Sequence, residues 1–264
     1  MKTLKSPFLI SLQEAIRIRH YSIRTEKAYL GWAKRYILFH NKRHPSTMGA
    51  NEVKQFLNHL ALEKNVAAST QNQALNALVF LYRHVLEQPF ENMQGLVYAK
   101  QKINIPVILS KNEIRQILSH LTGVQWLLVS LLYGSGLRVM ESLRLRVKDF
   151  DYSYKTITIR DGKGGKDRVV TFPDPIMKPL KNHLRIVHEQ HKRDLKSGYG
   201  QVYLSGALSR KYPNMDKEWA WQYAFPSLKI SKDPRTQIFR RHHYNESTIQ
   251  PKVGSLRRKP LKRW

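Results

Sequence analysis

The segment LLYGSGLRVMESLRL places an arginine, Arg138, directly after a glycine turn and at the start of a helix with an apolar face. Val139 and Leu143 follow at helical spacing, and a guanidinium beside such a face is unfavourable unless it is paired or functional. The planar guanidinium offers a fork of N–H donors that fits two non-bridging oxygens of a phosphate. The pattern predicts a phosphate-binding arginine, with a structural ion pair to Glu141 or Asp149 as the alternative.

A second group of candidate residues is the segment Gly162-Lys163-Gly164-Gly165-Lys166-Asp167-Arg168. Its glycines allow the backbone to approach a ligand closely. Lys163 could donate a proton to a departing oxygen or pair with a phosphate, and the alternative is an ordinary turn with solvated lysines. The spacing GxxxxGK[ST] is absent, which excludes a nucleotide P-loop.

The elements around these residues follow from hydrophobic periodicity. Residues 124–132 are nearly all apolar and predict a buried helix ahead of the glycine turn. Residues 154–160 and 167–172 alternate in polarity and predict an antiparallel β-hairpin with the lysines at its tip. A helix is expected from about residue 175 to residue 191, so this half combines helices with a small antiparallel sheet.

The first 90 residues predict four short helices, which suits a small bundle. Residues 91–106 contain glycine and proline and predict a linker to a second domain at 107–250. The expected helices cover about 8–20, a segment capped by Ser22, about 51–63, and a segment opened by the capping-box pair Thr70 and Gln73; a further capping box, Ser110 with Glu113, opens the helix after the linker.

The composition favours a polyanionic partner. The 264 residues include 46 Lys and Arg against 19 Asp and Glu, a net charge of +27, and the excess is +9 in residues 1–105 and +18 in residues 106–264. Nucleic acid is the commonest polyanion, while a ribosome-associated protein or an anionic membrane surface is the alternative. The chain has no cysteine, which excludes disulfides, thiolate zinc sites and a cysteine nucleophile. With no apolar run of membrane-spanning length and no secretory signal, a cytoplasmic location is expected.

Together, GLRVMESLRLRVKDFD and the GKGGKDR hairpin resemble the tyrosine site-specific recombinase (phage integrase) family. The segments YSIRTEKAYLGWAKRYILFH and ALSRKYPNMDKEWAWQYAFPS (207–227) are similar to the integron integrase subgroup, and the second resembles its characteristic insertion. The resemblance implies a mainly α fold with a small antiparallel β-sheet. It consists of an N-terminal four-helix, SAM-like core-binding domain and an α+β catalytic domain, which form a C-shaped DNA clamp.

The resemblance also implies a reaction. The family cuts DNA with a tyrosine through a 3′-phosphotyrosyl link and rejoins it, with no metal or other cofactor. Arg138 matches the arginine that holds the scissile phosphate, and Lys163 matches the lysine that protonates the leaving 5′-oxygen. Glu141 matches an acidic position that supports the site.

The DNA partner implied is a folded single-stranded or a double-stranded recombination site. Aromatic and prolyl faces in the insertion could stack on an unpaired base, or Trp219 and Trp221 could instead pack the insertion onto the domain. Histidines of the RRHH segment are expected to contact DNA, since no other metal ligand lies nearby in the sequence. The expected DNA-binding residues are Lys166, Arg168, Trp219, Trp221, Pro226, Arg240, Arg241, His242 and His243.

The sequence departs from the family after the hairpin. The family continues with His-x-x-Arg and a tyrosine nucleophile, but His188, His191, His242 and His243 have no arginine three positions later. Residues 251–264 read as a basic tail, and we expect a reading-frame shift or a premature end there, which leaves the catalytic domain incomplete. No nucleophile is identified.

Three interpretations result. The first is a site-specific recombinase of the integron integrase type. The second is a non-catalytic DNA-binding remnant of that lineage, and the third is a basic RNA- or ribosome-binding protein, against which the two motifs argue. The family assembles as tetramers on DNA, whereas this chain is expected to be a monomer with no membrane partner.

Overall fold

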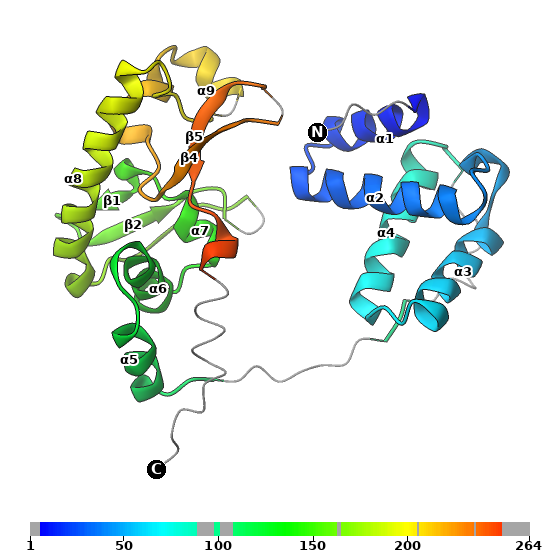
Figure 1. Cartoon of the computed structure of the whole chain (residues 1–264), viewed down its shortest axis with the longest axis horizontal. Coiled ribbons are helices and arrows are strands. Elements are labelled where there is room, and N and C mark those ends of the chain that lie inside the picture. Colours follow the sequence, from blue (N-terminus) through cyan, green and yellow to red (C-terminus); the bar gives the residue numbers. More distant parts are fainter. Residues whose placement is uncertain are drawn as a thin grey trace. The chain divides into compact units, whose positions relative to one another are not determined.

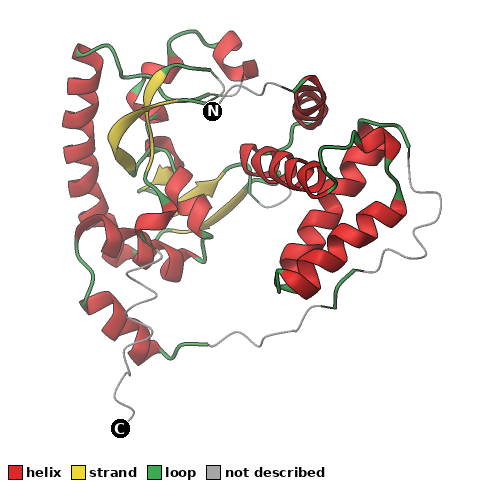
Figure 2. Ribbon diagram, turned by 45° about the vertical axis from the view of Figure 1, so that its right-hand side comes forward, coloured by secondary structure: helices red, strands yellow, loops and turns green. Residues whose placement is uncertain are grey.

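The computed structural model describes residues 6–88, 98–100, 108–162, 165–204, 206–234 and 236–249. The chain divides into two compact units, Met1–Pro106 and Val107–Trp264 (Figure 1). Most of the predicted linker at 91–106 lies outside the described residues, as does the tail at 251–264. Among the described residues, the strands all belong to the second unit (Figure 2).

The first unit packs its helices around one apolar core. Tyr36 of α2 (Ile23–Phe39) is fully buried in this core, and its hydroxyl lies 2.9 Å from that of Tyr82 on α4 (Ala68–His84). The predicted cap at Ser22 is confirmed, because its hydroxyl accepts a hydrogen bond from the backbone N–H of Thr25. The helices are α1 (Pro7–Ile18), α2 (Ile23–Phe39), α3 (Ala50–Asn58), which continues as a π-helical turn over His59–Glu63, and α4 (Ala68–His84).

The predicted capping box at Thr70 and Gln73 is wrong. Helix α4 begins two residues before Thr70, with Ala67 at the N-cap position and no side-chain cap. Gln73 instead accepts a hydrogen bond from the indole N–H of Trp32 on α2, at 3.2 Å. Packing against α2 thus stabilises a helix that starts two residues before the position that the local pattern predicts.

The second unit combines helices with two antiparallel sheets. The predicted hairpin is confirmed as β2 and β3, and the predicted capping box at Ser110 and Glu113 opens α5. A two-residue strand, β1, adds to the hairpin, and a separate β4–β5 ribbon was not predicted. The helices are α5 (Lys111–Ser119), α6 (Gly123–Ser135), α7 (Val139–Arg144), α8 (Asp174–Lys196) and α9 (Gly206–Lys211); the strands are β1 (Phe150–Asp151), β2 (Thr156–Ile159), β3 (Arg168–Thr171), β4 (Pro226–Lys232) and β5 (Phe239–His243).

The buried helix α6 and the turn after it position the start of α7. Leu128 and Leu131 of α6 are fully buried in the core of this unit, as the apolar run predicts. Gly136 ends the helix with φ of +63°, a left-handed conformation that a residue with a side chain rarely adopts. Leu137 then enters the core, and the following residue caps α7.

No helix in the described ranges is long and apolar enough to cross a membrane.

Candidate active site

Arg138 occupies the N-cap position of α7. Its backbone N–H donates to Oε2 of Glu141 at 2.9 Å, and its Nη1 donates to Oε1 of the same carboxylate at 2.7 Å. The side chain of Arg138 is 56% exposed, whereas that of Glu141 is 8% exposed. One edge of the guanidinium is therefore held by the protein, and more than half of the side chain remains accessible to a ligand.

Arg168, at the start of β3, grips the same carboxylate from the other side. Its Nη1 donates to Oε1 of Glu141 at 2.9 Å and its Nη2 donates to Oε2 at 2.6 Å, which is a bidentate pair. The hydrogen bonds from Arg168 are the main cause that lowers the pKa of Glu141 to about 2, and those from Arg138 add to it. The carboxylate is therefore ionised at pH 7.

Asp149, the second ion-pair partner predicted for Arg138, pairs with other residues. Asp149 is buried and accepts from the backbone N–H of Arg146 at 2.8 Å and from Nε of Arg160 at 3.0 Å. Glu141, and not Asp149, is therefore the ion-pair partner of Arg138. Two guanidinium groups share one carboxylate, so the cluster keeps a net positive charge that favours an anionic ligand.

The hairpin tip is described only in part. Lys163 and Gly164 lie outside the described residues, so the structure does not locate the predicted proton donor. Next to them, the N–H of Gly162 donates to the carbonyl of Lys166 at 3.2 Å, and Lys166 is exposed. This hydrogen bond closes the hairpin next to Arg168, the residue that pairs with Glu141.

The tryptophans of the insertion contact the rest of the second unit. Trp219 is partly buried against the core, with its ring centroid 4.6 Å from that of His188 and 6.0 Å from that of His191, both on α8. Trp221 carries the ammonium of Lys148 over its ring face at 2.8 Å from the centroid. Both indoles therefore pack the insertion onto the second unit, as the packing alternative predicts.

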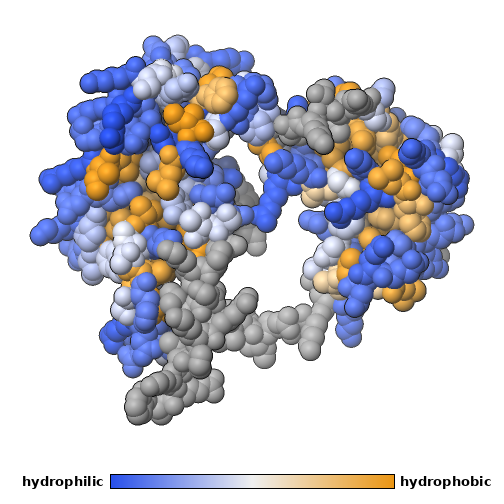
Figure 3. All heavy atoms as spheres, viewed as in Figure 1, coloured by the Kyte–Doolittle hydropathy of each residue, from blue (hydrophilic) through white to orange (hydrophobic). Residues whose placement is uncertain are grey.

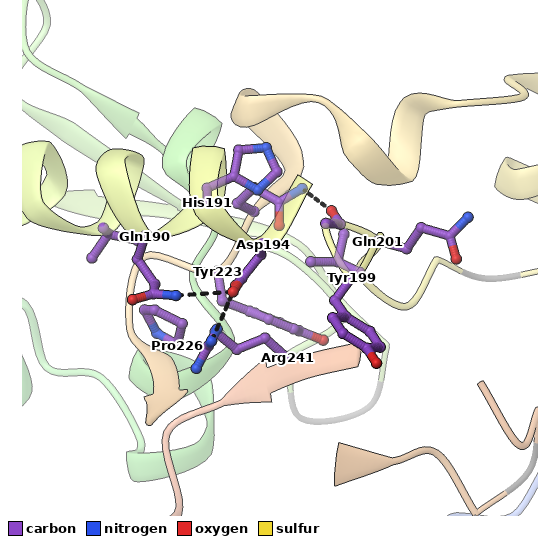
Figure 4. A pocket seen from close by; sticks show the side chains of 12 residues that line it. Gln190, His191, Asp194, Tyr199, Gln201, Tyr223, Pro226 and Arg241 are labelled. Carbon is purple, nitrogen blue, oxygen red and sulfur yellow. Dashed lines mark hydrogen bonds and ion pairs between the residues drawn. The ribbon is translucent and has the colours of Figure 1, made fainter. Parts of the chain in front are cut away.

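Arg240 and Arg241 of the RRHH segment are turned into the unit. Arg241 on β5 forms a bidentate pair with Asp194 of α8, at 2.6 and 2.8 Å, and its side chain is only 13% exposed (Figure 4). Arg240 is 6% exposed, and its Nη2 donates a hydrogen bond to the hydroxyl of Thr236 at 3.1 Å. Among the described residues, the charge of Arg241 is paired inside the unit, while Arg240 is buried without an ion pair, so DNA contact by these two arginines stays a prediction.

The histidines of that segment and Pro226 are partly buried. His243 contacts the ring of Tyr223 and the carbonyl of Tyr244, and burial lowers its pKa. Burial likewise lowers the pKa of His242. Pro226 begins β4 and lines the small cavity beside Arg241 (Figure 4). Both imidazoles therefore favour the neutral form at pH 7, which weakens their attraction for phosphate.

The sequence analysis did not single out Arg146 and Lys148, two basic residues whose cations lie against aromatic rings of the insertion. Arg146 donates to the carbonyls of Trp221 and Tyr203, at 2.5 and 2.8 Å, and its guanidinium lies 4.8 Å from the ring centroid of Tyr223. Burial, with the charge of Arg160 nearby, lowers the pKa of Lys148 to about 8. The alternation RLRVKD was the available signal, since every second residue from Arg144 to Lys148 is basic.

The described part of the second unit shows no hydrogen bond between a tyrosine hydroxyl and Arg138, Glu141 or Arg168. Of the tyrosines beyond α8, Tyr223 is buried, and burial raises its pKa. Tyr199, Tyr203 and Tyr212 are about 40% exposed.

One His-x-x-Arg spacing does occur, at His40 and Arg43, but it belongs to the first unit. Among the described residues, no group of three or more His, Asp or Glu could hold a metal ion.

The surface suits a charged partner. Hydrophilic side chains occupy much of the face shown for each unit, with apolar patches among them (Figure 3). In the second unit, exposed aromatic side chains have cations over their rings, as in Lys211 over Tyr212 and Lys232 over Phe239. Such pairs of a basic group and an exposed ring are common where proteins contact nucleic acid.

The fold is shared with a solved site-specific recombinase. The structure resembles that of the XerH site-specific recombinase bound to difH substrate, with a TM-score of 0.50 and 15% identity over 94% of this chain and 67% of that one. At this identity the likeness concerns the fold alone. The chain has the fold of the tyrosine recombinases.

Sequence comparison then gives the family. Residues 8–92 match the family described as phage integrase, N-terminal SAM-like domain, and residues 108–257 match the phage integrase family. An "Integrase/recombinase" of Escherichia coli is 40% identical over 258 residues, which cover 95% of this chain and 77% of that protein. "Tyrosine recombinase XerA" of Pyrococcus furiosus is 28% identical over 187 residues, 70% of this chain and 63% of that one. The chain belongs to the phage integrase family of tyrosine recombinases.

Proposed function

We propose that this protein binds DNA recombination sites as a tyrosine recombinase of the integron integrase type. Membership of the phage integrase family supports the recombinase assignment. The subgroup rests on the residues at 21–40 and on the insertion at 207–227. In the structure that insertion docks on the second unit through Trp219 and Trp221.

The observation that carries the proposal is the half-exposed guanidinium of Arg138. Glu141 holds one edge of it, and the remaining N–H donors are free to meet two oxygens of a DNA phosphate. In this role Arg138 would bind the scissile phosphate and stabilise charge as the bond breaks, and Lys163 would protonate the leaving 5′-oxygen. The net positive charge of the arginine cluster supports an anionic ligand.

Both halves of the chain are basic, so we propose that both contact the same DNA as a clamp. The charges would displace counterions from the duplex or folded strand, and affinity would fall steeply with salt. The structural relative XerH was solved bound to difH substrate, which is consistent with a DNA partner for this fold. In solution we propose a monomer.

We propose further that the 264-residue chain binds DNA without forming a covalent link. The argument rests on the second unit, where the histidines after the hairpin lack the His-x-x-Arg spacing and no described tyrosine contacts the arginine cluster. Among the described residues, the groups gathered around Glu141 can hold a phosphate, and none of them is a nucleophile that could attack it.

A covalent-complex assay tests this proposal. The protein is mixed with a labelled folded single-stranded site that carries a nick beside the scissile phosphate, and the sample is split between a denaturing and a native gel. We expect a shifted band on the native gel and no label on the denatured protein. Label retained on the protein would refute the non-covalent proposal, and loss of both signals would refute DNA binding. Arg138→Ala serves as the variant in which the native shift should weaken.

A further inference from the structure

We propose that Arg168 is a positioning residue that holds Arg138 in place through Glu141, an inference that rests on the proposed function of Arg138. The GKGGKDR motif predicts Arg168 as a DNA-binding residue. The geometry points to a different role, because its guanidinium is committed to the carboxylate that orients Arg138.

The hydrogen bonds divide the carboxylate of Glu141 evenly. Oε1 accepts from Nη1 of Arg138 and Nη1 of Arg168, while Oε2 accepts from the backbone N–H of Arg138 and Nη2 of Arg168. Each oxygen thus has two donors. A carboxylate gripped by a planar fork on one side has little freedom to rotate, so the donor on its other side is also held.

Exposure separates the two arginines. The side chain of Arg168 is 35% exposed, against 56% for Arg138. Arg168 uses both terminal nitrogens on Glu141, whereas Arg138 uses one terminal nitrogen and its backbone N–H. Arg138 therefore retains donors for a phosphate, and Arg168 acts on the phosphate through the carboxylate.

The backbone of the hairpin is fitted to this pair. A Cβ atom at Gly162 would lie 3.1 Å from Nη1 of Arg168, 2.8 Å from the carbonyl oxygen of Lys166 and 3.6 Å from Oε1 of Glu141. Only glycine allows this close approach. The Arg168–Glu141 pair consequently joins the base of the β2–β3 hairpin to the N-terminus of α7. The hairpin and Arg138 are thereby held in a fixed position relative to each other.

The test is a double-mutant cycle on DNA affinity, measured by fluorescence anisotropy with a labelled duplex oligonucleotide across a series of salt concentrations. The variants are Arg168→Gln and Arg138→Ala, alone and together. The matched control is Arg160→Gln, which removes the same charge and a similar ion pair, with Asp149, from the same hairpin.

We expect Arg138→Ala to weaken binding about tenfold and Arg168→Gln to weaken it roughly three- to tenfold. In the Arg138→Ala background, Arg168→Gln should cause no further loss of affinity and no further change in salt slope beyond that of Arg160→Gln. An additional loss there, with the slope lower by about 0.9, would show that Arg168 itself contacts a phosphate and would overturn the inference.

Two more variants separate positioning from charge. Arg168→Lys keeps the charge but not the fork, so it should not restore wild-type affinity. Gly162→Ala keeps every charge, but its methyl group would meet both the carbonyl oxygen of Lys166 and Nη1 of Arg168, so it should displace this pair of contacts and weaken binding roughly threefold. Wild-type affinity in both variants would contradict the proposed role of the fork.

A measurement without DNA distinguishes failure of this inference from failure of the proposed function. The Nε–H resonance of Arg138, assigned by its loss in Arg138→Ala, should shift in Arg168→Gln and stay in place in Arg160→Gln. An unchanged resonance in Arg168→Gln would overturn the positioning role. If the resonance shifts in Arg168→Gln but Arg138→Ala leaves DNA affinity unchanged, the coupling between Arg168 and Arg138 stands. The proposed function of Arg138 is then rejected.

Discussion

Replacing Glu141 by glutamine tests how much the arginine cluster contributes to stability. The pKa of this carboxyl is lowered from 4.5 to about 2, chiefly by hydrogen bonds from Arg168. That difference corresponds to about 3 kcal/mol. Arg138 and Arg168 are 56% and 35% exposed, so solvent screening reduces the expected value to about 2 kcal/mol.

The sign of the pH dependence follows from the lowered pKa. Glu141 contributes its full stability above the pKa of the unfolded chain, and this contribution is lost as the pH falls from about 4.5 toward 2. At pH 7 Glu141→Gln should therefore lower the free energy of unfolding by about 2 kcal/mol. Below pH 4 the gap should close by about 1.4 kcal/mol per pH unit.

Urea unfolding at pH 7, 5, 4 and 3, followed by circular dichroism and tryptophan fluorescence, measures this gap. Glu189→Gln is the matched control, because Glu189 also pairs with a cation, Lys192, at 2.9 Å but is exposed. The control should unfold as the wild type does. A Glu141→Gln variant as stable as the wild type at pH 7, or a gap that is the same at pH 7 and pH 3, would refute the reasoning.

Three further predictions concern contacts within each of the two units. Asp194→Asn breaks the mostly buried pair with Arg241 and should lower the stability of the second unit by roughly 3 kcal/mol in urea unfolding; an unchanged midpoint would show that the pair is dispensable. Tyr82→Phe removes the hydroxyl that contacts Tyr36 and the carbonyl of Pro45, and should lower the melting temperature of the first unit by the equivalent of about 1–2 kcal/mol; an equal or higher melting temperature would contradict this. Ser22→Ala removes the cap of α2 and should destabilise the first unit by about 1 kcal/mol, whereas Ser22→Asp should not; equal loss in both would argue against capping.

Local sequence signals identified the elements whose stabilising contacts are close in the chain. The caps at Ser22 and at Ser110 with Glu113 lie within three residues of their partners. The apolar run of α6 and the alternation of β2 and β3 are likewise read from adjacent residues, because burial on one face imposes a fixed period. These features were predicted from the sequence because their physical cause is short-range.

Features that depend on distant partners were missed or misread. The capping pattern at Thr70 was overruled by packing of α4 against α2, and the pairing of β4 with β5 was not predicted because the two strands stabilise each other. Arg241 is 47 residues from its partner Asp194, so its local sequence shows a free cation where the fold forms an ion pair.

The sequence by itself determined that the chain has a basic, two-part, mainly helical organisation of the recombinase type, with an arginine at the start of a helix and a glycine-rich hairpin. Only the tertiary structure decided which cations remain available to a ligand. Arg138 and Arg168 have the same chemistry, and what separates them is the geometry around Glu141, set by a helix and a strand that meet 27 residues apart. A charge is a property of one residue, whereas its availability depends on the partners that the fold brings to it.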